Sequence, residues 1–282
     1  MIQYGMRCHD ICPAGAMTDV LDTVRANGIH IIHLAMSKSF SDYDFSVGHY
    51  SAGLANHIRE ELKKRDIHVA ILGCYINPAH PDEEKRKAEV ARFIEHLKYA
   101  KQIGADMVGT ETGRFSADFS VTEKTNTEEC YERVLGTFKE VVHAAEQIGV
   151  TVGVEGVFNH TLHSPELMKR FLYDIDSSAV DVIFDAVNMI TPEADTPGKQ
   201  TEIMDKAFAW YGNRISVLHL KDFVFEGRDQ KYRHPGDGNF YYPALMKHVK
   251  KEKPMIMGLL ENSTTERFQG DCEYLQKQFD MA

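Results

Sequence analysis

Short apolar runs alternate with longer segments of helical periodicity along the whole chain. The apolar runs are continuous, with few polar interruptions, as expected of parallel strands that are buried on both faces. Eight such runs predict strands at residues 2–6, 30–36, 68–74, 107–111, 151–157, 180–185, 215–220 and 255–261. Segments with helical spacing follow them at residues 18–27, 54–65, 82–103, 127–148, 165–173, 199–211, 242–250 and 266–279.

Capping residues support these boundaries. The helix expected over residues 82–103 begins with Asp82 and Glu83 and is followed by Gly104, in agreement with dipole and C-cap preferences. Eight β-α units in series predict an α/β fold of the (β/α)8 TIM-barrel type, with residues 1–282 as a single domain.

A doubly wound open sheet is the alternative fold. It would more often carry a glycine fingerprint after its first strand, whereas residues 7–13 read RCHDICP, without GxGxxG or GxxxxGK[ST]. Residues 112–126 form the longest segment without apolar periodicity. On the catalytic rim of a barrel, a loop of this length often acts as a lid or binding loop.

Composition and charge exclude several classes of protein. No apolar run approaches the roughly 20 residues needed to span a bilayer, so we expect no membrane segment. The formal net charge of −10 disfavours binding to nucleic acid. We also expect no signal peptide. Because the five cysteines are scattered, we expect a reducing, cytoplasmic location.

The most informative residues stand at the ends of four consecutive expected strands. They are Glu155, Asp185, His219 and Glu261. The carboxyl ends of barrel strands meet at the catalytic rim, and three carboxylates there would repel one another strongly. A divalent cation relieves this repulsion, and a Glu/Asp/His set suits Mn²⁺, Co²⁺, Zn²⁺ or Mg²⁺. Each residue alone is more often structural, but four such ends together predict one metal site.

Other clusters are weaker. Cys8, His9, Asp10 and Cys12 follow the first strand, where a loop with unligated thiols is favoured over a second metal site. Three further histidines on or beside expected strands are interpreted as hydrogen-bonded structural residues: His30, His33 and His68.

Five segments carry a resemblance to a known family. They are VGVE (152–155), IFDAVN (183–188), HLKD (219–222), PGDG (235–238) and LEN (260–262). In this order they resemble the xylose isomerase-like superfamily of metal-dependent TIM barrels. Within it they are similar to the sugar isomerase/epimerase group of tagatose 3-epimerase, hydroxypyruvate isomerase and inosose dehydratase-like proteins. The resemblance is strongest over residues 150–262.

The resemblance implies that Glu155, Asp185, His219 and Glu261 hold one divalent ion, often Mn²⁺. It implies a sugar or sugar-phosphate isomerase or epimerase that acts through an enediolate, with Glu155 and Glu261 as the acid/base pair. Epimerases of this group often carry a histidine at the position of Asn188. Asn cannot titrate near neutral pH, so ketohexose specificity does not carry over directly.

Lys221 lies on the same side of its strand as His219 if residues alternate with a period of two. We expect it either to bind a substrate oxygen or to form a salt bridge with Asp222 or another rim acid. A sugar phosphate would need a cation, for which Arg114 and Arg233 are the candidates. The full set of expected substrate contacts is Asn188, Lys221, His160, Glu111, Arg114 and Arg233.

Three other functions fit parts of the pattern. A metal-dependent polyol or inosose-type dehydratase would use the same four ligands. An endonuclease IV-like nuclease is opposed by the negative charge and by the absence of histidines in Ala35-Met36 and Cys74-Tyr75. A non-catalytic sugar-binding barrel would not need the metal. The expected partner is a small sugar or sugar phosphate, with neither nucleic acid nor membrane, and a homo-oligomer is compatible with the sequence.

Overall fold

The computed structural model describes residues 1–282. Eight parallel strands form a closed barrel in the order β1-β10-β7-β6-β5-β4-β3-β2, so the predicted (β/α)8 barrel is confirmed. The strands are β1 (Gln3–Arg7), β2 (Ile31–Leu34), β3 (His68–Gly73), β4 (Ala105–Glu111), β5 (Thr151–Glu155), β6 (Val180–Asp185), β7 (Ile215–Leu220) and β10 (Met257–Leu260).

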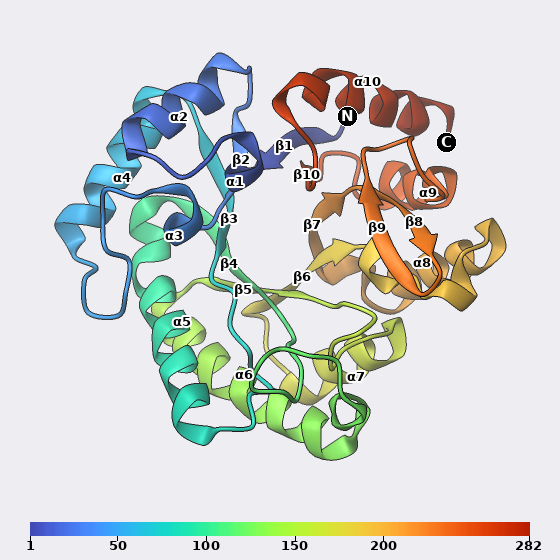
Figure 1. Cartoon of the computed structure of the whole chain (residues 1–282), viewed down its shortest axis with the longest axis horizontal. Helices are drawn as coiled ribbons and strands as arrows, with labels where there is room; N and C mark the ends of the chain where they lie inside the picture. Colours follow the sequence, from blue (N-terminus) through green and yellow to red (C-terminus); the bar gives the residue numbers. More distant parts are fainter.

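Eight helices surround the barrel, as Figure 1 shows. They are α2 (Met17–Ala26), α4 (Ala52–Lys64), α5 (Glu83–Ile103), α6 (Glu128–Ile148), α7 (Pro165–Ile175), α8 (Pro197–Tyr211), α9 (Tyr242–Glu252) and α10 (Thr265–Met281). The predicted caps of α5 are present. The Asp82 carboxylate accepts hydrogen bonds from two backbone N–H groups, and Gly104 is left-handed with φ of 92°. None of the helices has the length and apolarity to cross a bilayer.

Several short elements differ from the sequence prediction. The segment after the first strand was predicted as a loop but forms helix α1 (Cys8–Ile11), and α3 (Met36–Ser39) begins inside the second predicted strand. Strands β8 (Asp222–Glu226) and β9 (Asp229–Arg233) form an antiparallel hairpin after β7. A single helical turn is too short to show periodicity, which explains the first two differences. The 3-10 helices are η1 (Glu123–Asn126), η2 (Val187–Met189), η3 (Pro192–Ala194) and η4 (Gly212–Arg214).

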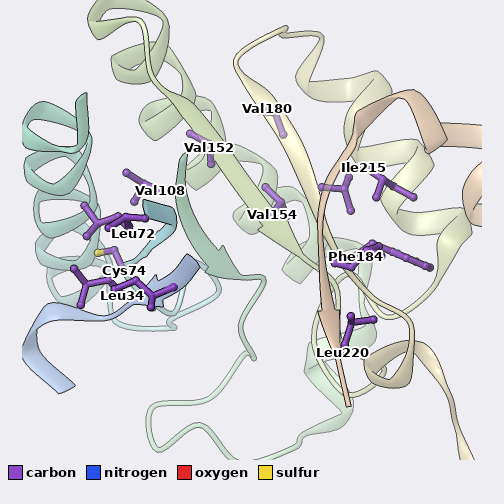
Figure 2. Packing of buried hydrophobic residues seen from close by; sticks show 14 of the residues in the cluster. Leu34, Leu72, Cys74, Val108, Val152, Val154, Val180, Phe184, Ile215 and Leu220 are labelled. Atoms are coloured by element: carbon purple, nitrogen blue, oxygen red, sulfur yellow. The ribbon is translucent and has the colours of Figure 1, made fainter. Parts of the chain in front are cut away.

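The apolar residues of each strand are divided between two layers. Inside the barrel, six buried residues form a small cluster that includes Ile183 and Val217. Apolar residues beside them in the strands, such as Val182 and Phe184, belong to the larger cluster between strands and helices. Figure 2 shows Val152, Val154 and Phe184 in this larger cluster. Because side chains alternate along a strand, the residue two positions after an inward apolar residue also faces inward. This alternation places the polar strand ends inside the barrel.

Candidate metal centre

Each of the eight barrel strands contributes one polar residue to the interior at its carboxyl end. Strand register aligns these residues in pairs: Arg7 is opposite His33, Glu111 is opposite Glu155, and Asp185 is opposite His219. The sequence analysis singled out four members of this row as metal ligands and a fifth, Glu111, as a substrate contact. The complete row is Arg7, His33, Tyr75, Glu111, Glu155, Asp185, His219 and Glu261.

The structure brings the four predicted metal ligands together. One donor atom from each of Glu155, Asp185, His219 and Glu261 lies within 4.8 Å of the donors of the other three. All four residues are at most 4% exposed. His219 Nδ1 lies 3.2 Å from Glu155 Oε2 and 3.4 Å from Glu261 Oε1.

The unsatisfied polar atoms of this cluster fit a metal ion. Both ring nitrogens of His219 are buried, and neither makes a hydrogen bond of good geometry, although Nδ1 lies 3.2 Å from Glu155 Oε2. A buried imidazole normally gains a partner for each nitrogen, because an unpaired polar group in the interior costs about 1–3 kcal/mol. Three carboxylates and one imidazole are donors that divalent ions such as Mn²⁺, Zn²⁺ and Co²⁺ accept. The four side chains are therefore suited to hold such an ion.

Lys221 shares its ammonium group between two of these carboxylates. Its Nζ lies 2.8 Å from Asp185 Oδ2 and 2.9 Å from Glu261 Oε2, and the side chain is buried. The Tyr232 ring covers it, with Nζ 4.4 Å from the ring centroid. Of the two expectations for Lys221, the salt bridge with a rim acid is present, and both partners belong to the candidate metal centre.

The neighbouring Asp222 has a different role. Its carboxylate accepts hydrogen bonds from the backbone N–H groups of Phe223, Gly236 and Phe240. A Cβ atom at Gly238 would lie 2.3 Å from Phe223 O and 2.4 Å from Asp222 Oδ1, so only glycine fits there. The HLKD and PGDG segments thus meet in one hydrogen-bonded turn that fixes the base of the β8–β9 hairpin above the site.

Asn188 connects two of the carboxylates. Its Nδ2 donates a hydrogen bond of 2.7 Å to Glu155 Oε1, and its backbone N–H donates one of 3.0 Å to Asp185 Oδ1. Asn188 lies in η2 and is 4% exposed. Groups that orient metal ligands in this way are often as necessary as the ligands themselves.

Arg7 is a member of the site that the sequence analysis did not identify. Its Nη1 lies 3.3 Å from Glu261 Oε1, while Nε and Nη2 bind the two oxygens of Asp10 at 2.9 and 3.0 Å. Burial acts to raise the pKa of Glu261, but the positive charges of His219, Lys221 and Arg7 outweigh it and hold that pKa well below its usual range. The period-two pattern of β1, extended to its last residue, would have predicted Arg7 here.

His33 was interpreted as structural, yet it lies against the site. Its ring stacks on His219 with centroids 5.3 Å apart and planes 5° apart, and Tyr75 Oη lies 3.1 Å from its Nε2. Donor atoms of His33, His219 and Glu261 also lie within 4.8 Å of one another, so this ring is a further potential ligand. A Cβ atom at Gly73 would lie 2.5 Å from His33 Nε2, and glycine therefore makes room for the ring.

A cavity of about 260 Å³ opens above the carboxylates, and we call it the inner compartment. Glu261 lines it, whereas the other three candidate ligands lie outside its lining and are buried. Five of the expected substrate contacts also line it: Glu111, Arg114, His160, Asn188 and Lys221. Arg233 does not line it; this residue ends β9, and its guanidinium lies 3.6 Å from Glu226.

Two titratable side chains of the inner compartment, Glu111 and His160, have shifted pKa values. Burial and the nearby charges of Glu155 and Glu261 raise the pKa of Glu111 to about 7, which suits proton exchange near neutral pH. Burial and the charge of Arg114 lower the pKa of His160 to about 3, so its ring is neutral.

Arg114 is already bound to the protein. It donates hydrogen bonds to Asn159 Oδ1 at 2.7 Å, to Asn159 O at 3.1 Å and to Phe119 O at 2.8 Å. Its guanidinium also lies 5.0 Å from the Phe119 ring centroid. These contacts use both terminal nitrogens and Nε to hold the 112–126 loop.

Comparison with known proteins relates the chain to one family and to several solved structures. The family profile described as xylose isomerase-like TIM barrel matches residues 20–278. An uncharacterized protein of Methanocaldococcus jannaschii is 24% identical over 179 residues, which cover 62% of this chain and 57% of that protein. The match thus spans little more than half of that relative.

Two solved structures share the fold over nearly their whole length. The structure of a D-tagatose 3-epimerase-like protein has a TM-score of 0.75 at 18% identity and covers 99% of this chain and 98% of its own. The IOLI protein with a binding zinc atom has a TM-score of 0.71 at 16% identity and covers 99% and 96%. At these identities the likeness shows the barrel fold alone.

Proposed function

Because this chain belongs to the xylose isomerase-like TIM barrel family, we propose that it is a divalent-metal-dependent isomerase or epimerase of sugars or sugar phosphates. The observation that carries this proposal is the set of four buried donors, Glu155, Asp185, His219 and Glu261, within 4.8 Å of one another beneath a polar cavity. The solved structures of a D-tagatose 3-epimerase-like protein and of the IOLI protein with a binding zinc atom share this fold, and they support the same class.

An ion held by Glu155, Asp185, His219 and Glu261 would supply Lewis-acid chemistry: it would stabilise the negative charge of an enediolate when a carbonyl substrate loses a neighbouring proton. Mn²⁺ is the ion that we propose first, and Zn²⁺, Co²⁺ and Mg²⁺ are accepted by the same donors. The chain's own residues then determine which proton moves and where it returns.

Glu155 and Glu261 form the proposed acid/base pair. They approach the centre from β5 and from the end of β10, with His219 of β7 between them at 3.2 and 3.4 Å. One carboxylate would remove a proton from one face of the substrate, and the other would return a proton to the opposite face. Return to the same carbon gives epimerisation, whereas return to the adjacent carbon gives aldose–ketose isomerisation. A positioned acid or base contributes about 10²–10⁴-fold in rate.

The partners of the two glutamates differ. Glu155 accepts a hydrogen bond from the neutral amide of Asn188, whereas Glu261 faces the cations Arg7 and Lys221.

We propose that five residues contact the sugar or shape its binding site: Asn188, Lys221, His160, Glu111 and Arg114. Arg233, which does not line the inner compartment, is the weakest of the expected contacts.

Metal content tests the centre directly. We expect purified protein to hold about one equivalent of divalent metal by elemental analysis, and Glu155→Gln and Asp185→Asn to lose most of it. Glu129→Gln, at an exposed position of α6, is the matched control and should retain the metal. Equal, low metal content in the wild type and all three variants would contradict the proposal and favour a non-catalytic barrel.

Turnover in D₂O separates the reaction types. With Mn²⁺ and a panel of free and phosphorylated ketoses, an isomerase or epimerase should place deuterium on carbon without loss of water. Release of a deoxy-ketone would instead identify a dehydratase that uses the same ligands. Cleavage of a duplex with an abasic site, without any change to the sugars, would indicate the nuclease alternative.

A further inference from the structure

A second cavity adjoins the inner compartment. It has a volume of about 420 Å³ and shares Arg7, Glu111 and Phe119 with the inner compartment, so the two meet along these three side chains. We call this second cavity the outer compartment; Lys38, Tyr75 and His80 are among its other lining residues. The inner compartment alone, at about 260 Å³, is smaller than the roughly 300–1,000 Å³ of ordinary ligand sites, whereas the joined space falls within that range.

The charged residues of the outer compartment do not balance. Arg92 is paired with Glu89 at 2.9 Å, and Arg7 is held by Asp10 and Glu261. The ammonium group of Lys38, by contrast, forms neither a salt bridge nor a hydrogen bond with the protein, and Nζ lies 4.9 Å from the centroid of the Tyr75 ring.

His80 is a further polar residue of this lining. Its Nδ1 lies 3.0 Å from the backbone N and 3.3 Å from the backbone O of Asp82, whereas its Nε2 forms no hydrogen bond with the protein and faces no competing partner there.

We propose that the outer compartment binds an anionic group, phosphate or carboxylate, of the same sugar whose carbonyl end lies at the metal centre, and that Lys38 recognises this group. The inference rests on the proposed function and narrows its substrates to anionic sugars. Lysine binds such oxygens as a compact point charge with three donors. Of the two arginines expected from the sequence to serve a sugar phosphate, Arg233 does not line the inner compartment. Arg114 lines it but already donates hydrogen bonds to Asn159 and Phe119.

Substitution at Lys38 tests the proposal with a matched control. Lys38→Met removes the charge and keeps the length, while Lys38→Arg keeps the charge. Lys98 is the control, because it also lies over a tyrosine ring (Tyr99, 5.2 Å) without a salt bridge, but it is on α5 and lines neither compartment. Lys98→Met should therefore bind every probe as the wild type does.

Calorimetry with the metal-loaded protein gives the readout. The probes are D-fructose, D-psicose and D-tagatose, their 6-phosphates, and D-fructuronate as the carboxylate. We expect at least one anionic probe to bind ten- to a hundredfold more tightly than its neutral counterpart. Lys38→Met should abolish this preference, and Lys38→Arg should retain most of it. The phosphate and carboxylate probes distinguish the two anions.

Two results would overturn the inference. One is that the wild type binds the anionic and neutral probes equally or binds none of them. The other is that Lys38→Met keeps the preference for the anion. Neither result bears on the proposed metal centre. That proposal is refuted only if the protein holds no metal and turns over none of the sugars in D₂O. Binding of an anionic probe that depends on Lys38, in a protein without turnover, would instead support the outer compartment and refute the proposed reaction.

Discussion

The ammonium nitrogen of Lys221 lies 2.8 Å from Asp185 Oδ2, and both side chains are almost completely buried. A cation of the protein therefore neutralises part of the negative charge that a metal ion would also neutralise. Removal of one member of a buried charge network costs about 3–5 kcal/mol, because the remaining charge loses its partner.

The first prediction concerns Lys221→Met. We expect the metal-free variant to melt on the order of 5–10 °C below the wild type, since Asp185 and Glu261 lose their cation. Added Mn²⁺ should raise its melting temperature more than that of the wild type. The matched control is Lys206→Met, since Lys206 also bridges two carboxylates, Glu166 and Glu202, but on the surface, where such pairs contribute about 0–1 kcal/mol. Equal melting of both metal-free variants would contradict the prediction.

The second prediction concerns the hydrogen bond of 2.7 Å from Asn188 to Glu155. Asn188→Ala should lower metal affinity or kcat by about 10–100-fold, because Glu155 loses the group that orients it. Metal titration and steady-state kinetics measure the two effects separately. Asn213→Ala, at an exposed position of η4, is the control and should change neither. Unchanged affinity and kcat in Asn188→Ala would show that Glu155 is oriented by other groups.

The third prediction concerns the 112–126 loop, where Phe119 has a left-handed backbone with φ of 65°. Glycine adopts this conformation freely, whereas alanine is strained by about 1 kcal/mol. Phe119→Gly should therefore be more stable than Phe119→Ala in urea unfolding. Val121 is an exposed position of the same loop without positive φ, so Val121→Ala should be more stable than Val121→Gly. If the alanine variant were more stable than the glycine variant at both positions, residue 119 would not be left-handed in solution.

The fourth prediction is a pH dependence of stability caused by His96. This buried ring lies 2.9 Å from Arg92 O through Nδ1 and 3.1 Å from Tyr50 Oη through Nε2, contacts that satisfy the neutral form. Burial lowers its pKa from 6.5 to about 4. The unfolded chain therefore binds a proton that the folded chain rejects, and stability falls as the pH drops from 6.5 towards 4.

Between pH 7 and 4.5 this single group should cost on the order of 2 kcal/mol. The measurement is urea unfolding at both pH values for the wild type, His96→Gln and His57→Gln, whose site is exposed on α4. His96→Gln should lose about 2 kcal/mol less than the wild type over this interval, although it starts from a lower stability. His57→Gln should lose as much as the wild type. An identical loss in all three proteins would exclude the contribution of His96.

The barrel and five of the eight residues of the interior row could be predicted from the sequence alone. Continuous apolar runs predict parallel strands because both faces of such strands are buried, and the boundaries of β6 and β7 were predicted to the residue. The grouping of Glu155, Asp185, His219 and Glu261 was predictable because four parallel strands must end at the same rim. The β8–β9 hairpin and helices α1 and α3 were not, since short turns lack a periodic pattern.

The groups that surround the carboxylates could be identified only from the three-dimensional structure. Arg7 reaches Glu261 across 254 positions of the chain, and His33 stacks on His219 from the opposite half of the sequence. The Lys38 ammonium group has no salt bridge, whereas the Arg114 guanidinium is hydrogen-bonded to Asn159, which follows β5. These distinctions depend on closure of the barrel, which joins the first strand to the last, and on which donors the fold has already used. Local sequence records the type of a side chain, whereas its partners are set by the packing of distant strands.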